Sequence, residues 1–559
     1  MAATASKNKN KGKTVQFEDV RRGIASLVLA EIPKLLTLLD RTPVSATYGC
    51  FDRAYWHYRM MDFPCGMSQE FVLPLALVWS MDELPGNVYH RDPQIREYIL
   101  AAIRFAARSA HADGSCDDYY PFERAAGAAA FSLFAILETL DVIELAADPE
   151  IDAFVQRRAH WLASHTESGR LSNHEALIVS CLERAGRRYP GAGFEVAMAT
   201  RLRRLLSWQH AEGWFDEYGG ADLGYLSLTI GLLADLDRRR PDLGLRRPLA
   251  AAIDFLANFV HPDGTVGGEY SSRSTLNFFP FGFEIAGAWH EDALRINNLA
   301  LLPLVELRPP CYSDDRIIGH HLWGWLFTLR EFRRDRPLDP PQRTGRAWFS
   351  GCGLLVDRTP STMLVAALSR GGVYKYFADG RLVASDTGIT LALSGRGKVA
   401  VTHLGGATVS VSDTHIDVSG EMAWAKSTRL TPAKNIVLRI VMLGFGRFFP
   451  DLVRRLLQKV LVTGKSAAPF SFRRQFEKTP QGWLVRDEIS AAQGWQDVGR
   501  IGISGHQSST TTIMARVYQE SQLVPFIDLA PRLKGLAAGG RLTFERHLQG
   551  SHQQGGGHA

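Results

Sequence analysis

Four copies of one short phrase decide the fold of this chain. Each copy begins with a histidine, continues with an acidic residue and ends with a glycine, and the copies are spaced roughly 45–55 residues apart. Such a period is typical of a repeated supersecondary unit. Each copy follows an amphipathic segment and precedes a polar, glycine-rich stretch, so we expect similar loops on one side of a helical array. The copies are His111-Ala112-Asp113-Gly114, His165-Thr166-Glu167-Ser168-Gly169, His210-Ala211-Glu212-Gly213 and His261-Pro262-Asp263-Gly264.

The segments between these phrases have the periodicity of helices. Apolar residues recur at i, i+3, i+4 and i+7 from about residue 16 to about residue 335. Paired helices repeated at this interval form a solenoid or close into an α/α toroid. The sequence alone does not decide closure, and we expect an incomplete barrel of helical hairpins over 16–335. The expected helices include Ile99–Ala110, Ala125–Leu140, Ala176–Arg184, Val196–Gln209, Leu226–Leu236 and Leu249–Val260.

The character of the chain changes after a charged, proline-rich run. Residues 336–345 read as a linker, and beyond them short runs rich in Val, Thr and Leu alternate with Gly and Asp. This pattern predicts an antiparallel β-sandwich over 346–548. An apolar segment near 435–463 interrupts it and contains several arginines, too many for a membrane span. We expect a helix packed between the two domains, with an interfacial membrane helix as the alternative.

Composition narrows the classes of function. The chain has 559 residues, 45% hydrophobic and 22% charged, so it is long enough for more than one core. Its formal net charge of +6 is compatible with an acidic partner, and without a concentrated basic motif we expect no nucleic-acid partner. The six cysteines form no close pair, so we expect no metal and no cofactor, although a structural metal in the β-sandwich stays an open alternative.

The two ends of the chain are polar. We expect residues 1–15 to be a disordered basic tail and residues 549–559 to be flexible. No apolar signal core follows the N-terminal lysines, and no segment reads as a transmembrane helix. The default expectation is therefore a cytoplasmic protein, or a periplasmic one if a signal has been removed.

The second repeat continues into a candidate site, Asn173-His174, just before a predicted helix. In one interpretation Ser172 or Asn173 caps that helix. In the other, the amide and the imidazole bind a carboxylate beside the helix N-terminus.

Later repeats add polar and aromatic residues at corresponding positions. The third repeat contributes Trp214, Glu217 and Tyr225, and aromatic faces beside hydrogen-bond acceptors suit sugar rings. The fourth contributes Glu269, Tyr270 and Arg273, where Arg273 either pairs with Glu269 or holds a carboxylate of the substrate.

Two further groups of candidate substrate-binding residues lie outside the repeats. An earlier aromatic and ionic cluster offers a cleft wall, and a lysine stands in the predicted β-sandwich. The alternative for the aromatic and ionic cluster is packing within a helical hairpin. The alternative for the lysine is a solvated residue on a strand. These candidates are Arg53, Trp56, Gln69, Glu70 and Lys375.

With these residues in place, the chain resembles the heparinase II/III-like polysaccharide lyases. The resemblance rests on Asn173-His174 before a helix, the Tyr225 region one repeat later, and the stretch from Gly268 to Arg273. It implies an α/α toroid joined to a β-sandwich, with a cleft at the seam. The chain departs from the family where a β-domain histidine motif is expected, because the corresponding stretch has Lys375 and no histidine.

The resemblance also implies a mechanism and an acidic polysaccharide or oligosaccharide as partner. Asn173 and His174 would neutralise a uronate carboxylate, Tyr225 would act as acid or base, and Glu269 and Arg273 would orient the substrate. Two alternatives stay open. One is a glycoside hydrolase that uses two carboxylates among Glu217, Asp222 and Glu269. The other is a glycan-binding relative without catalysis.

Overall fold

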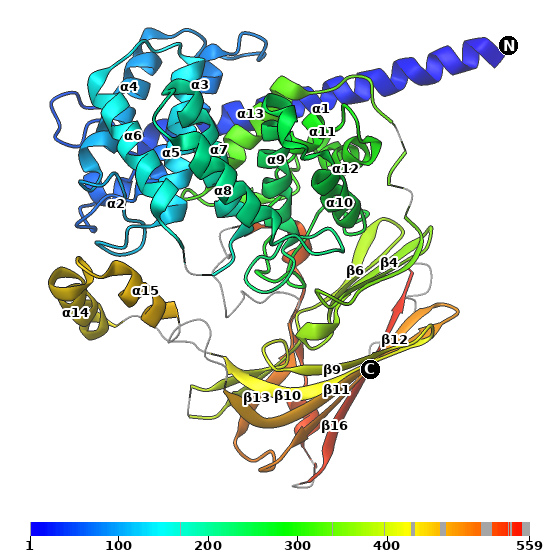
Figure 1. The fold of residues 1–559 in the computed structure, drawn as a ribbon. Coiled ribbons are helices and arrows are strands. Elements are labelled where there is room, and N and C mark those ends of the chain that lie inside the picture. The colour runs from blue at the N-terminus through cyan, green and yellow to red at the C-terminus, as the bar shows by residue number, and fades with distance from the viewer. Residues whose placement is uncertain are drawn as a thin grey trace.

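A computed structural model places the helices and the strands in two separate regions, as Figure 1 shows. The structure describes residues 2–550 except 168, 338, 342, 396, 426–430, 459–465, 505–516, 535, 537 and 538, and it describes no side chains before residue 17. The predicted tail after residue 550, the end of the predicted 435–463 helix and part of the predicted linker lie outside the described residues.

Six inner helices form a closed ring. Each one contacts the next along the chain, and the last contacts the first, so the toroid is closed where the sequence led us to expect an incomplete barrel. Four of them are buried along most of their length, because they face the ring centre on one side and the outer helices on the other. The inner helices are α3 (Val72–Ser80), α5 (Ala126–Val142), α7 (Ser172–Arg188), α9 (Leu223–Arg239), α11 (Phe281–Ala286) and α13 (Ile318–Glu331).

Amphipathic outer helices pack on this ring, each beside an inner partner. Helix α1 begins at Ala2, so residues 2–15, expected to be a disordered tail, are its first turns. Alanine and lysine are frequent there, and both favour helix. The outer helices are α1 (Ala2–Leu38), α4 (Pro93–Ser109), α6 (Pro149–Ser164), α8 (Phe194–Leu206), α10 (Arg246–Ala257) and α12 (Glu291–Leu301); a short α2 (Arg53–Trp56) precedes α3.

The repeated phrase forms the same tight turn three times, after α4, α8 and α10. In the first copy the amide of Gly114 donates to the carbonyl of His111 at 2.8 Å, and the amide of His111 donates to the carbonyl of Ser115 at 2.9 Å. The glycine has a positive φ of 88°, and a Cβ there would lie 2.5 Å from the backbone nitrogen of Arg158 in α6. Only glycine satisfies both demands. The phrase therefore fixes how each hairpin packs on the next outer helix.

The strands build two stacked antiparallel sheets. Among the described residues, the smaller sheet runs in the order β2 (Gly345–Phe349), β3 (Leu354–Arg358), β4 (Thr362–Ala367), β5 (Val373–Ala378) and β6 (Arg381–Asp386). The larger has the order β15 (Ile527–Asp528), β13 (Val498–Ile503), β7 (Ile389–Leu393), β8 (Val399–Val401), β10 (His415–Ala425), β11 (Ala467–Thr479), β12 (Gly482–Ala491) and β16 (Arg541–Gln549), and β9 (Ala407–Val411) pairs with β10.

The smaller sheet is the middle layer of the molecule. Alternate residues of a strand point to opposite faces, and here Val373 and Phe377 belong to the core of the toroid, whereas Tyr374 and Tyr376 belong to the core between the sheets. The two regions are further joined by a short ladder between β1 (Tyr312–Ser313) and β14 (Val517–Tyr518). The toroid and the sandwich therefore share a continuous buried seam on this side.

One segment of the sandwich differs from expectation. We expected a single helix packed between the domains near 435–463, but α14 (Pro432–Val441), a π turn (Met442–Gly446) and α15 (Pro450–Gln458) form a hairpin that projects beside the toroid (Figure 1). Most of its apolar side chains are exposed. None of the helices in the described residues is long and apolar enough to cross a membrane.

Candidate active site

A cavity of about 210 Å³ lies where the N-terminal ends of inner helices meet. Residues of α5, α7, α9 and α13 contribute to its wall, together with the loops before them, and all of its lining residues come from the toroid. The cleft implied by the resemblance was expected at the seam, but this cavity has no lining residue from the sandwich. Three of the predicted site residues line it: His174, Tyr225 and Arg273.

Tyr225 and Arg273 are in direct contact inside this cavity. The guanidinium carbon of Arg273 lies 4.3 Å from the ring centroid of Tyr225 and 5.0 Å from that of Tyr218. Asp222 caps α9 by accepting from the amide of Tyr225 at 3.0 Å, which fixes Tyr225 in the first turn of the helix. The same carboxylate accepts from the amide of Arg273 at 3.1 Å. Asp222 thus fixes the backbone positions of both Tyr225 and Arg273.

The charge of Arg273 is secured although the side chain is buried. Burial by itself lowers the pKa of this guanidinium, but the phenol of Tyr225 and the carboxylate of Glu217 more than offset it, so the pKa lies above its ordinary value. Glu217 accepts from Nη1 of Arg273 at 2.7 Å. The cavity therefore has a permanent positive charge over the face of a tyrosine ring.

His174 stands on the first turn of α7 and is part of a histidine–carboxylate pair. Its Nδ1 lies 2.8 Å from Oε2 of Glu167, and its side chain is 19% exposed. Across the cavity wall its ring lies against Gly127 of α5, where a Cβ would come within 2.9 Å of Nε2. A carboxylate on Nδ1 fixes the orientation of the ring. His174 can then exchange a proton or donate a hydrogen bond through Nε2.

His320, which was absent from the sequence-based candidates, lines the same cavity and belongs to a second pair of this kind. Nδ1 of His320 lies 2.8 Å from Oε1 of Glu70, and the ring of His320 lies 4.8 Å from that of Phe131. Glu70, a predicted substrate-binding residue, is fully buried and is not in the cavity wall. It supports His320 instead. The signal in the sequence was His320-His321 inside an otherwise apolar helix.

Acidic side chains line the side of the cavity nearest α5. Asp118 pairs with Arg316 at 2.5 Å, and Glu123 accepts from the backbone amides of Asp118 and Tyr119 at 3.2 and 2.7 Å. The guanidinium of Arg316 also lies over the ring of Tyr119 at 5.0 Å. The wall therefore combines carboxylates, cations and aromatic rings, a mixture that suits a polar ligand with apolar faces.

Asn173 is buried behind this wall and does not line the cavity. Its Nδ2 donates to Oε1 of Glu217 at 2.9 Å, and its backbone amide and the hydroxyl of Ser172 donate to Oε2 at 3.3 and 2.8 Å. Glu217, which is 1% exposed, belongs to the next repeat and accepts the hydrogen bonds of the N-terminus of α7. Both residues were expected to face substrate. In the structure they join α7 to Arg273, which makes them positioning residues of the site.

The fourth repeat is covered by the smaller sheet. Nζ of Lys375 in β5 lies 3.3 Å from Oε2 of Glu269, and both side chains are buried. Tyr270 is buried as well, with its hydroxyl 2.8 Å from Nε2 of His261, whose ring stacks on Phe377. Burial lowers the pKa of His261 well below its usual value and raises that of Tyr270. Glu269, Tyr270 and Lys375, all predicted to bind substrate, instead hold the seam together.

Four remaining candidates are also occupied by structural contacts away from the cavity. Trp56 donates to the carbonyl of Leu38 at 2.8 Å, and Gln69 donates to the carbonyls of Gly49 and Ala102 at 3.1 Å. Arg53 lies over the ring of Tyr58 at 5.2 Å, and Trp214 donates to Glu212 at 2.8 Å. Glu212 in turn accepts from the amide of Gly351, so the third repeat anchors the sandwich.

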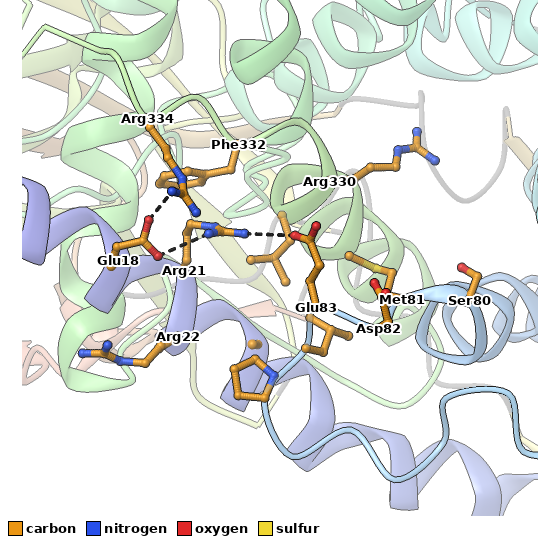
Figure 2. Close-up of a pocket in the computed structure, with 14 residues that line it drawn as sticks. Glu18, Arg21, Arg22, Ser80, Met81, Asp82, Glu83, Arg330, Phe332 and Arg334 are labelled. Atoms are coloured by element: carbon orange, nitrogen blue, oxygen red, sulfur yellow. Dashed lines mark hydrogen bonds and ion pairs between the residues drawn. The ribbon is translucent and has the colours of Figure 1, made fainter.

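A larger cavity of about 480 Å³ lies at the other end of the ring, where α3 and α13 finish (Figure 2). Its charged residues pair with one another: Arg21 with Glu18 and Glu83 at 3.2 and 3.6 Å, and Arg334 with Glu18 at 3.3 Å. None of the predicted site residues lines it. These ion pairs join α1 to the ends of α3 and α13, so the contacts have a structural explanation.

Across the residues that the structure describes, no group of three or more His, Cys, Asp or Glu side chains has the arrangement of a metal site.

Comparison with solved structures identifies the architecture. The chondroitin AC lyase of Streptomyces coelicolor A3, solved with chondroitin sulphate, aligns over 87% of this chain and 68% of its own at 11% identity, with a TM-score of 0.52. The two chains share one fold. Weaker alignments, each with a TM-score of 0.35, are to the heparan sulfate lyase HepC of Pedobacter heparinus (11% identity, 80% of this chain, 72% of that one) and a GH127 β-arabinofuranosidase (9%, 86% and 89%).

The α/α toroid with an antiparallel β-sandwich predicted from the sequence is confirmed. No protein-family model matches the chain, and no curated protein matches it in sequence.

Proposed function

We propose that this chain is a carbohydrate-active enzyme that cleaves a uronate-containing polysaccharide or oligosaccharide by β-elimination. The observation that carries the proposal is the convergence of three residues on one cavity at the N-terminal ends of inner helices: His174 from the first turn of α7, Tyr225 from the first turn of α9 and Arg273 from the loop before α11. The shared fold with a chondroitin AC lyase supports the same reading.

The chemistry explains why these residue types would be needed together. In β-elimination a base removes the C5 proton of the uronate, the C4–O bond breaks, a C4–C5 double bond forms and the leaving oxygen gains a proton. Tyrosine removes such a proton only as its phenolate, and a nearby cation favours that charged form. Arg273, 4.3 Å from the ring centroid of Tyr225, would supply that charge. We assign Tyr225 as the base.

The C5 proton becomes acidic only when the adjacent carboxylate is neutralised. We assign this role to His174 and His320, whose Nδ1 atoms lie 2.8 Å from Glu167 and Glu70 respectively. Because the carboxylate occupies Nδ1, Nε2 is the atom of each ring that remains to bind a ligand. A hydrogen-bond donor held in a fixed orientation stabilises negative charge that develops on the substrate. Asn173 would act indirectly, through Glu217 and Arg273, rather than on the substrate.

A glycoside hydrolase on this scaffold is the second candidate, favoured by the carboxylates of Glu123 and Glu167 in the cavity wall. The carboxylates first considered for this role, Glu217, Asp222 and Glu269, are buried. Hydrolysis needs one carboxyl group as acid and another as base or nucleophile. Here Glu167 is bonded to His174 and Glu123 to two backbone amides, arrangements that favour orientation over proton transfer.

Product analysis separates these functions. The purified protein is incubated with uronate-containing polymers, and the ultraviolet absorbance of the unsaturated product is followed together with new reducing ends. The lyase proposal predicts that both rise in equal amounts. Reducing ends without the absorbance would establish hydrolysis. Saturable binding with neither signal, across chondroitin, heparan and alginate substrates, would establish a glycan-binding protein.

A further inference from the structure

The hairpin of residues 432–458 exposes an unusual concentration of apolar side chains. Ten large hydrophobic residues in it have exposed fractions between 39% and 65%. Single exposed hydrophobic residues need no explanation, but a contiguous group marks an interaction surface. The ten are Ile436, Val437, Ile440, Val441, Leu443, Phe445, Phe448, Phe449, Leu452 and Leu456.

Helical periodicity places one part of this group on the outer face of α14. Ile436 and Ile440 are four residues apart and so are Val437 and Val441, so both pairs lie on one side of the helix. The side that faces the protein is different, because Met442 is buried and Arg439 pairs with Asp62 at 2.9 Å. The apolar face is therefore turned away from the described part of the protein.

The turn between the helices carries the aromatic part. Phe445 and Phe449 stack with centroids 4.7 Å apart, and the guanidinium of Arg447 lies over Phe448 at 4.5 Å. By sequence, residues 432–458 contain Lys434, Arg439, Arg447, Arg454 and Arg455 against the single acidic residue Asp451. The hairpin is thus both apolar and positively charged.

We infer that this hairpin docks the protein on the surface of a bilayer that contains anionic lipid. An apolar face with phenylalanine and leucine, bordered by arginine and lysine, is the composition of helices that lie in the membrane interface. Arg439 is paired with Asp62, and phosphate groups of anionic lipids complement the other basic residues, such as Lys434 and Arg447. A protein partner would require a counterpart shaped to these side chains, whereas a bilayer accepts an apolar face of any shape.

Arg439 connects the hairpin to the loop before α3, close to the candidate active site. Arg439 contacts Asp62 and lies over the ring of Phe63 at 5.5 Å, and the same loop runs on to Met67, which lines the candidate active site. Docking through the hairpin would hold this side of the toroid close to the lipid surface. The inference does not depend on which reaction the cavity performs.

Vesicle co-sedimentation of the full chain tests the inference. Vesicles of phosphatidylcholine with phosphatidylglycerol are compared with vesicles of phosphatidylcholine alone, at low and high salt. We expect binding to the anionic vesicles that weakens with salt, because screening reduces charge attraction. The triple variant Phe445→Ser/Phe448→Ser/Phe449→Ser should reduce the partition coefficient by about tenfold or more.

Two matched variants control this experiment. The conservative triple Phe445→Leu/Phe448→Leu/Phe449→Leu should keep most of the binding, since a bilayer has no shaped pocket for a ring. Val44→Ser/Val196→Ser removes exposed apolar residues outside the hairpin and should bind as the wild type does.

Three results would overturn the inference. They are absence of wild-type binding to anionic vesicles, equal binding by the serine triple, or loss of binding by the leucine triple as severe as that by the serine triple. A dimer in solution that the serine triple dissolves, without a change in vesicle binding, would assign the surface to a second copy of the chain.

Discussion

The cavity and the seam are built from the same residue types, and they differ in what covers them. His261 in the seam is fully buried, with Nε2 bonded to Tyr270 and its ring against Phe377 of β5. His174 at the cavity also has a partner on Nδ1, but its side chain is 19% exposed. Where a strand of the sandwich lies over a loop, its polar residues become ties between domains. Where no strand lies over it, they stay available to a ligand.

The largest contrast should appear between two tyrosines. We expect Tyr225→Phe to lower kcat by roughly 10²–10⁴-fold, because the base is removed while the ring that Arg273 contacts is kept. Tyr270→Phe is the matched control in the seam and should change turnover little. The measurement is the initial rate of unsaturated product, with thermal unfolding of both variants. Normal turnover in Tyr225→Phe would remove this residue from the mechanism.

Mutations in the seam should change the stability of the protein rather than its turnover. Lys375→Met leaves the buried carboxylate of Glu269 without its cation, which we expect to lower the free energy of unfolding by roughly 3–5 kcal/mol. The double variant Lys375→Met/Glu269→Gln should recover much of this loss, as a double-mutant cycle in urea would show. Turnover per folded molecule should stay near that of the wild type. If Lys375→Met instead raised KM with stability intact, Lys375 would belong to the substrate site.

The sequence predicted the scaffold better than the site. Helical period, the recurring glycine phrase and the short Val/Thr/Leu runs all reflect local backbone geometry. The α/α toroid followed from the first two and the β-sandwich from the third. Which residue faces the cavity depends on contacts between distant repeats. The predicted residues Tyr225 and Arg273 line the cavity, but Asn173 and Glu217 bond to each other 44 residues apart, and no local pattern reveals that. His320 was missed because its partner Glu70 lies 250 residues away.

Two adjacent histidines sharpen the comparison within one helix. His320 lines the cavity, whereas His321 lies 3.2 Å from Oδ1 of Asn277 and does not. We expect His320→Gln to reduce kcat/KM by roughly 10²-fold, because an aimed hydrogen-bond donor is lost. His321→Gln should reduce thermal stability with turnover retained. If the two variants lowered kcat/KM equally, the loss would come from the place of the histidine in the helix and not from its contact with the cavity.

The last comparison concerns pH. Burial lowers the pKa of His403 and His321 to about 3, with a smaller contribution from Arg370 and His320 respectively, and it lowers the pKa of His261 well below 6.5. In the unfolded chain these groups protonate near pH 6.5. Because the unfolded state then binds more protons, stability should fall as pH drops below 6.5, by up to about 1.4 kcal/mol per pH unit for each histidine.

A single variant in the sandwich isolates this effect from the titration of carboxylates. Between pH 6.5 and pH 4, His403→Gln should lose stability less steeply than the wild type does. Chemical denaturation at a series of pH values measures the slope. An unchanged slope would show that His403 is not held in its neutral form.

The most direct test of the account is a crystal structure of the Tyr225→Phe variant with a uronate oligosaccharide. We predict that a uronate ring lies in the cavity, with its carboxylate toward His174 and His320 and its C5 hydrogen facing position 225. An oligosaccharide bound at the seam, or at the arginine-lined cavity at the other end of the ring, with the candidate active site unoccupied, would contradict the account.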